Sequence, residues 1–214
     1  MNNANKAILA TALIGFAYLA SRKVLAMPGG LGALVAGQLS LPETSEIVRY
    51  TLATDNFPNV SPVMLGTVIE IESARKPFAI RPEPHIQDFS VGMTQTLVKT
   101  ARALFDLGFD NYPRPDQLNM AYADTDSRRV SESPAKILFD PRASIYFGAA
   151  ALQDLYWYGS GSKTDEWIIR AYNGGPGWQT ASATSKAMTA AHWQRYQETE
   201  PRVRPYYTGS VSIG

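Results

Sequence analysis

The sequence predicts a mainly α-helical domain that follows an apolar N-terminal segment. Several apolar stretches begin with a Ser, Thr or Asp that can cap a helix. No stretch shows the sustained two-residue alternation that is typical of a half-buried strand. Gly and Pro separate the apolar stretches. We therefore expect residues 1–41 to form the N-terminal segment and residues 42–214 to form one helical domain.

The N-terminal segment contains three basic residues and no acidic residue among its first 30. Residues 7–20 are apolar or small, and this run is shorter than the roughly 20 residues that a membrane span needs. It matches the apolar region of a secretory signal, but Arg22 and Lys23 precede the weak cleavage site at 24–26. We expect an apolar helix that is retained and associates with a membrane or directs export. The alternative is a helix that packs on a partner protein.

Helices are expected in order along the domain. The ranges are 42–54, 61–73, 94–107, 140–158, 164–172 and 185–197. Ser61 precedes Pro62 and Asp140 precedes Pro141, and each pair combines a capping side chain with the residue that suits the first helical turn. Thr164 is the expected cap of its helix.

Loops are expected between these helices. The segment between 73 and 94 is interrupted by Pro77, Pro82 and Pro84, so we expect a loop there. Residues 110–133 are predicted to be a long loop with one helical turn at most. The sequence Gly174-Gly175-Pro176 ends the helix before it.

The composition excludes several classes of function. A net charge of +1, from 20 basic and 19 acidic residues, argues against a nucleic-acid partner. The absence of cysteine excludes disulfides and thiol catalysis, and two histidines leave few ways to build a zinc site or a Ser-His-Asp triad. The HExxH, GxSxG, GxGxxG and P-loop patterns are absent. Carboxylate chemistry remains, and it requires neither a metal nor an organic cofactor.

Two glutamates lie at the end of the helix expected at 61–73. Glu70 and Glu72 are about 200° apart around the helix, so they face different sides. The side chain of Glu72 follows an apolar stripe, Leu65, Val68 and Ile69. Partial burial would raise the pKa of the Glu72 carboxyl and keep it protonated near neutral pH, as a general acid requires. The alternative is an ordinary helix-end glutamate in solvent.

Short motifs around Glu72 occur in a fixed order. They are Glu72-Ser73, Pro77 with Ala79, Gly92-Met93-Thr94-Gln95, Thr100-Ala101, Leu138-Phe139-Asp140-Pro141, Gly148-Ala149 and Ala171-Tyr172-Asn173-Gly174-Gly175-Pro176-Gly177. This series resembles the soluble lytic transglycosylase family, whose members cleave peptidoglycan, and it covers residues 61–177. The stretch Arg81-Pro-Glu-Pro-His85, leading to Ser90-Val-Gly92, is similar to phage-associated members.

The chain departs from the family pattern in three places. Lys76 stands where the family usually has Asn, and Met93-Thr94 replaces Leu-Met. The loop at 110–133 is an insertion relative to compact members. The first two differences affect the expected shape of the sugar-binding wall and leave the acid in place.

The resemblance implies a lysozyme-like fold with a sugar-binding groove between helical lobes. It also implies cleavage of the β-1,4 bond between N-acetylmuramic acid and N-acetylglucosamine, with Glu72 as the single catalytic acid and base and a 1,6-anhydro end as product. A loop carboxylate, Glu83 or Asp88, is the alternative assistant. The alternative functions are a muramidase-type hydrolase, and a structural component of a virion or secretion machine with weak or no catalysis.

The resemblance also implies substrate-binding residues: Ser73, Gly92, Met93, Gln95, Tyr172 and Asn173. Tyr172 is expected to place its hydroxyl against Glu72, and Gln95 and Asn173 to bond to sugar. The competing interpretations are structural: a helix-end serine, first-turn capping by Gln95, a buried tyrosine and a C-terminal asparagine. Gly92 is expected at a tight turn.

Most of the remaining polar and aromatic residues are predicted to have structural roles. Asp140 is expected to cap a helix, His85 to hold the Pro-rich loop, and His192 to lie at the surface or in packing. Trp178 is the best tryptophan candidate for the groove because it follows the Gly-Pro-Gly turn.

The expected partners and location follow from the resemblance. Glycan strands of peptidoglycan are the expected substrate, and residues 1–41 are expected to contact a membrane or other virion proteins. The expected location is a virion or the bacterial cell envelope, where a virion-borne enzyme would open the wall during phage entry.

Overall fold

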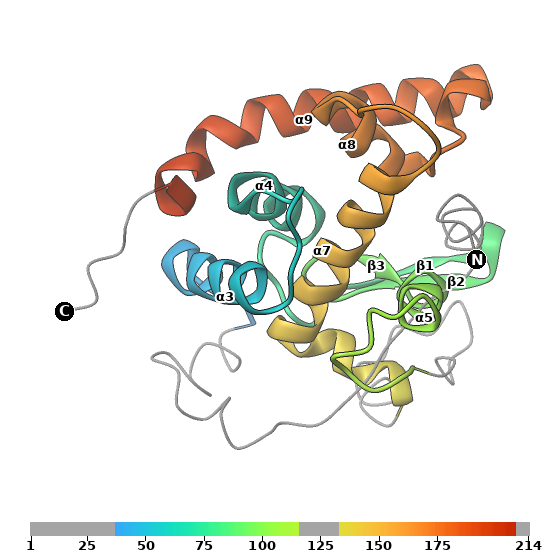
Figure 1. Ribbon diagram of the computed structural model, residues 1–214. Helices are drawn as coiled ribbons and strands as arrows, with labels where there is room; N and C mark the ends of the chain where they lie inside the picture. Colours follow the sequence, from blue (N-terminus) through green and yellow to red (C-terminus); the bar gives the residue numbers. More distant parts are fainter. Residues whose placement is uncertain (1–36, 116–132, 209–214) are drawn as a thin grey trace.

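A computed structural model describes residues 37–115 and 133–208, and these form a mainly helical fold with one small antiparallel sheet (Figure 1). The elements in order are α3 (Leu41–Thr54), α4 (Pro62–Ser73), β1 (Ile80–Glu83), η2 (Pro84–Ile86), β2 (Asp88–Val91), β3 (Thr96–Leu97), α5 (Val98–Asp106), η3 (Pro134–Phe139), α7 (Pro141–Trp157), α8 (Asp165–Gly174), η4 (Trp178–Thr180) and α9 (Ala183–Thr208). The prediction of a mainly α-helical fold is confirmed.

The predicted apolar helix of the N-terminal segment lies outside the described residues, as does most of the loop predicted at 110–133. Within the described parts of the chain, no helix is long and apolar enough to cross a membrane. Leu39 is buried in the core of the helical domain, and its backbone N–H donates to the carbonyl of Arg75 over 3.1 Å. Leu39 therefore packs as part of the helical domain, ahead of α3.

The predicted helix starts are observed with their capping bonds. Ser61 Oγ accepts from the backbone N–H of Met64, and Thr164 Oγ1 accepts from that of Trp167. Asp140 Oδ1 accepts from two backbone N–H groups of α7, at 2.9 and 3.0 Å, so it caps that helix as expected. These bonds satisfy N–H groups that have no partner inside a helix.

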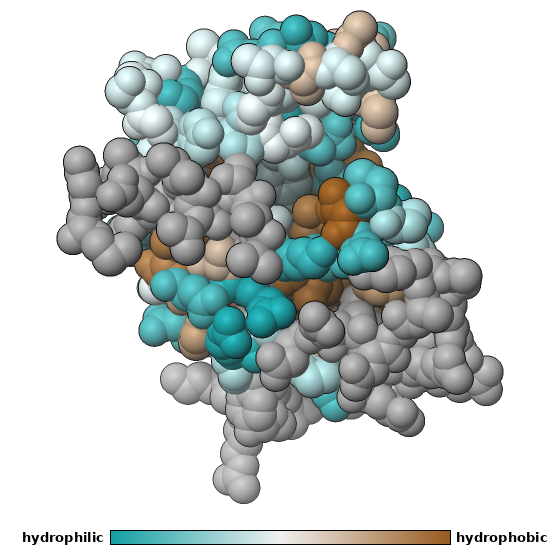
Figure 2. Space-filling model, turned by 90° about the vertical axis from the view of Figure 1, so that its right-hand side faces the viewer, coloured by the Kyte–Doolittle hydropathy of each residue, from teal (hydrophilic) through white to brown (hydrophobic). Residues whose placement is uncertain are grey.

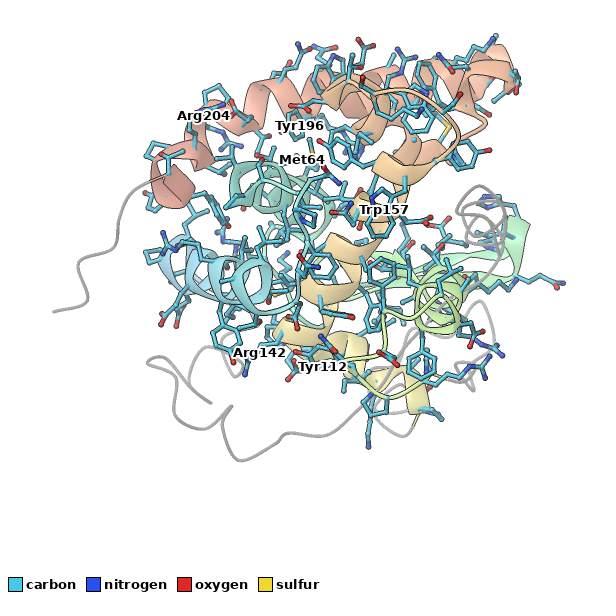
Figure 3. All side chains as sticks on the ribbon, in the orientation of Figure 1. Met64, Tyr112, Arg142, Trp157, Tyr196 and Arg204 are labelled. Atoms are coloured by element: carbon cyan, nitrogen blue, oxygen red, sulfur yellow. The ribbon has the colours of Figure 1, made fainter. Side chains whose placement is uncertain are left out.

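Helix α7 runs through the middle of the molecule and supplies much of the core. Helices α3 and α4 pack on one side of it, and α5 and the sheet lie on the other (Figure 1). Figure 3 shows Arg142 and Tyr112 near the start of α7, and Met64 and Tyr196 where α4 faces α9. The core thus holds α4 and α9 against each other.

Helix α9 is longer than predicted and crosses α4 and α8 (Figure 1). The prediction that it ends near 197 is wrong, because it continues past Pro201 and Pro205 to Thr208. Proline normally disfavours a helix interior, but the far half of α9 buries Val203 and Tyr207. The ring of Tyr207 lies directly over Gly66, where a Cβ would come within 2.3 Å of it. Packing against α4 therefore outweighs the local preference.

The segment after α4 is a sheet where a loop was predicted. The strand order is β1-β2-β3, with Pro82 opposite Phe89 in the β1–β2 pair. Proline is tolerated there because β1 is an edge strand. The helix predicted from residue 94 begins instead at Val98, since Thr96 pairs with Val91 in the sheet and Gln95 has a positive φ of 47°.

Candidate active site

Helix α4 carries Glu72 in its last turn, above the fully buried Leu65, Val68 and Ile69. The Glu72 side chain is only 7% exposed. Burial raises the pKa of this carboxyl to about 7, while the positive charges of Arg81 and Arg195 act in the opposite direction. At neutral pH the group is therefore divided between its protonated and ionised forms, which suits alternating acid and base chemistry.

Glu70 lies on a different side of α4 and has a different environment. Its carboxylate forms an ion pair with Arg75, just beyond the helix end. The two glutamates thus separate as the helical spacing predicts: Glu70 is paired, and Glu72 is buried without a hydrogen bond from the described residues.

His192 of α9 lies beside Glu72, with its Nε2 atom 3.5 Å from Oε1 of the carboxyl. The residue is 1% exposed, and burial lowers the pKa of the imidazole to about 4, so the ring is neutral at neutral pH. Arg195 donates to Nδ1 over 3.2 Å, which assigns the ring proton to Nε2. Among the described residues this N–H has no hydrogen-bond partner, and it faces Glu72.

The turn at 92–95 is the point where the separate motifs meet. Ser73 donates its hydroxyl hydrogen to the Met93 carbonyl over 2.7 Å, and Tyr172 donates to the Thr94 carbonyl over 2.8 Å. From α7, Ser144 bonds to Thr94 through its hydroxyl and through its carbonyl. Three helices therefore hold this turn next to the end of α4.

Close packing around the turn requires small residues. Gly92 has a φ of +77°, and a Cβ there would lie 1.9 Å from the Leu138 carbonyl oxygen. A Cβ on Gly148 would lie 2.3 Å from the Thr94 methyl carbon. Met93 is fully buried below the turn. In the structure, Gly92 and Met93 are therefore tightly packed residues of the turn. Their predicted contact with substrate stays a prediction.

Tyr172 interacts electrostatically with Glu72 and also lines a neighbouring cavity. The Glu72 charge contributes to a raised pKa of the Tyr172 hydroxyl, after burial, which is the larger cause. Tyr172 also lines a cavity of about 690 Å³, together with the predicted Gln95 and Asn173. Glu72, Ser73, Gly92 and Met93 do not belong to the lining of this cavity.

The cavity lies between the start of α9, α8, the end of α7, α5 and the β3 strand. Figure 2 shows the face that bears the sheet, where brown apolar atoms gather in the hollow below the pale upper part of the molecule. Gln95 is 8% exposed, and its amide nitrogen donates to the carbonyls of Ala79 and Gly92. Its amide oxygen is the polar atom left for a ligand. Asn173 is exposed at the rim of the cavity.

The loop carboxylates occupy structural positions. Glu83 accepts hydrogen bonds from Arg81 and Ser90, and its charge raises the pKa of Glu72. Asp88 accepts from the backbone N–H groups of Phe89 and Lys99 and so fixes the start of α5. Each already has hydrogen-bond donors, unlike Glu72.

Three residues of this region were missed by the sequence analysis: His192, Arg195 and Asp154. His192 and Arg195 are brought to Glu72 by the packing of α9, which no local pattern reports. Asp154 follows Gln153, and together they interrupt an apolar stretch of α7, which was a signal in the sequence. Its side chain lines the cavity, and burial raises its pKa to about 7.

Two other predicted residues lie at the edge of the region or beyond it. His85 lines the cavity with a 72% exposed side chain, 3.9 Å from Glu83. Trp178 packs against the guanidinium of Arg170 and is not part of the cavity wall. Across the described ranges, no group of three or more His, Asp or Glu side chains is placed to hold a metal ion.

Comparison of the chain with models of protein families, with curated proteins and with solved structures finds no match.

Proposed function

We propose that this protein is a peptidoglycan lytic transglycosylase that cleaves the β-1,4 bond between N-acetylmuramic acid and N-acetylglucosamine. One observation carries the proposal: Glu72 is a nearly buried carboxyl, with its pKa raised to about 7, next to the turn that the other motif residues hold. The resemblance of the ordered motifs supplies the reaction class, and the geometry supplies a group able to perform it.

In the first step, protonated Glu72 gives its proton to the glycosidic oxygen, and the bond from that oxygen to the anomeric carbon breaks. Desolvation favours the protonated form and so keeps the acid available at neutral pH. The acetamido oxygen of the N-acetylmuramic acid stabilises the positive anomeric centre, as in substrate-assisted glycosidases. A second catalytic carboxylate is then unnecessary.

In the second step, the Glu72 carboxylate removes the proton of the muramic acid 6-hydroxyl. That oxygen bonds to the anomeric carbon and forms the 1,6-anhydro ring, so no water is consumed and Glu72 regains its proton. The neutral His192 directs its Nε2–H at the carboxyl and stabilises the ionised form between the two steps. Arg81 and Arg195 add positive potential with the same effect.

The remaining predicted residues support the site in this proposal. Tyr172 and Ser73 hold the turn through its carbonyl groups, and Gly92 and Met93 shape it. Gln95 and Asn173 offer polar atoms to a glycan strand in the adjoining cavity. Pockets of several hundred Å³ are typical of small-ligand sites.

Product chemistry tests this proposal. Purified peptidoglycan is digested with the full chain, and the muropeptides are analysed by mass spectrometry. Products with 1,6-anhydro ends, 18 Da lighter than hydrolytic products because no water is added, are expected. Reducing ends would establish a muramidase instead. Intact peptidoglycan would favour a structural component of a virion or secretion machine.

The setting of the activity is a separate part of the proposal. The apolar residues 7–20 and the phage-like stretch 81–92 suggest a virion-associated enzyme that opens the cell wall locally during entry. Residues 1–41 would then contact a membrane or other virion proteins. Proteomic analysis of purified particles tests this: the protein is expected among the particle proteins, and its absence would remove the virion role while leaving the enzymatic one intact.

A further inference from the structure

Asp154 is a buried carboxyl that the proposed reaction does not use. It lies near the end of α7, is 9% exposed, and lines the cavity beside Gln95, Tyr172 and Asn173. No described residue donates a hydrogen bond to it, and its raised pKa has burial as its sole cause, so no charged neighbour, Glu72 included, acts on it. An unpaired polar group costs stability when it is buried.

The surroundings of Asp154 do not explain the carboxyl. The adjacent cavity wall is apolar at Leu104, Ala151, Leu155 and Ala171. A leucine at position 154 would continue this wall without the cost of desolvation. The carboxyl does not cap a helix, bind an arginine or fix a loop within the described residues. Asp154 is one of the residues that line the cavity.

The lining around Asp154 combines two kinds of surface. Its apolar residues offer a face for the C–H groups of a ring. The polar residues Thr100 and Asn173 also line this space. This combination suits a neutral, hydroxylated ring, because a sugar has both apolar C–H faces and hydrogen-bonding edges. A free ammonium group would need the ionised form of Asp154, which burial disfavours.

We propose that Asp154 accepts hydrogen bonds from the hydroxyl and amide hydrogens of an N-acetylhexosamine ring bound in this cavity, whose lining includes Tyr172 but not Glu72. The inference deepens the proposed function and rests on it for the substrate class. Asp154 is a binding residue in this view and takes no part in bond cleavage.

Binding of tri-N-acetylchitotriose to the full chain tests the inference. The measurement is isothermal titration calorimetry in an E72Q background, which prevents turnover. Asp154→Leu is expected to weaken binding by at least about 10-fold. Asp154→Asn retains an acceptor oxygen and is expected to stay within about 3-fold of the parent. The control Asp106→Asn changes an exposed carboxylate of α5 outside the cavity and is expected to have no effect.

The outcomes separate this inference from the proposed function. Unchanged binding by Asp154→Leu would overturn the inference even if the wild type cleaves peptidoglycan. Equal losses in the leucine and asparagine variants, with competition by 1,5-diaminopentane, would also overturn it by identifying an ammonium site. Asp154-dependent binding in a chain that does not cleave peptidoglycan would uphold the subsite and refute the enzyme. Thermal melting confirms that each variant is folded.

Discussion

His192 directs a neutral ring N–H at the carboxyl of Glu72, with 3.5 Å between Nε2 and Oε1. The two residues come from α9 and α4, which are far apart in sequence and pack against each other where α9 crosses α4. Such a donor favours the ionised carboxylate, whereas burial favours the protonated acid. Burial raises the pKa of Glu72 to about 7 against the positive charges of Arg81 and Arg195, and at that value both steps of the proposed reaction can occur.

Replacing His192 with phenylalanine tests this balance. Loss of the N–H should raise the pKa of Glu72, so the alkaline limb of the pH profile of kcat/KM should move to higher pH. The turnover number should fall by about 10-fold or more, because the carboxylate loses a stabilising donor. His192→Gln restores an N–H at similar reach and should recover much of the activity. A profile that does not move in His192→Phe would mean that His192 only packs.

The buried carboxyl of Glu72 should also be visible in the pH dependence of stability. Its pKa is about 7 in the folded protein, against an ordinary value of 4.5 for a glutamate, so the folded state binds this proton more tightly. The stabilisation is present below about pH 4.5 and is lost as the pH rises through about 7. Glu72→Gln removes this loss, and the variant should gain about 3 kcal/mol relative to the wild type between about pH 4 and pH 8.

Denaturant titrations of both proteins at several pH values measure this difference. Glu70→Gln is the matched control, because Glu70 sits two residues away on the same helix and is paired with Arg75. A constant difference between Glu72→Gln and the wild type across this range would show that Glu72 is solvated.

We expect the buried carboxyl of Asp154 to lower the free energy of unfolding of the protein. Burial raises its pKa from 3.8 to about 7, and above that pH the ionised group costs at most about 4 kcal/mol. Asp154→Leu should therefore be more stable than the wild type at about pH 8, with a smaller gain at about pH 4. Chemical unfolding at the two pH values checks this. A leucine variant less stable at both would mean that the carboxyl has a structural partner.

Gly92 should tolerate no side chain. A Cβ at this position would lie 1.9 Å from the Leu138 carbonyl oxygen, and the φ of +77° is already unfavourable for other residues. Gly92→Ala should lose about 3 kcal/mol or more of stability, since backbone must move to relieve the clash. Gly159 also has a positive φ, of +66°, but open space around it, so Gly159→Ala should lose only about 1 kcal/mol. Similar losses of stability in both variants would show that the positive φ, and not the clash with Leu138, causes the loss at Gly92.

The sequence alone predicted the elements whose signals are local. The caps at Ser61, Asp140 and Thr164 were readable because a capping side chain acts within three residues of itself. The burial of Glu72 followed from helical spacing. The prediction that Glu72 takes part in catalysis came from the ordered motifs, and it stays a prediction.

The features that depend on tertiary contacts were not predictable in this way. The helix expected at Thr94 fails because Thr96 and Leu97 pair with β2, and the continuation of α9 past Pro201 depends on Tyr207 packing over Gly66. His192 has an unremarkable sequence context, and only the crossing of α9 over α4 brings it to Glu72. Long-range packing decided each of these cases.

The most direct measurement is the rate at which Glu72→Gln and Glu70→Gln release muropeptides from purified peptidoglycan, compared with the wild type. Both substitutions remove one carboxylate from the same helix, but only Glu72 is buried beside His192 and Tyr172. We predict that Glu72→Gln is folded and inactive while Glu70→Gln retains the wild-type rate and its 1,6-anhydro products. Undiminished release of anhydro-muropeptides by Glu72→Gln would contradict the assignment of Glu72 as the catalytic acid and base.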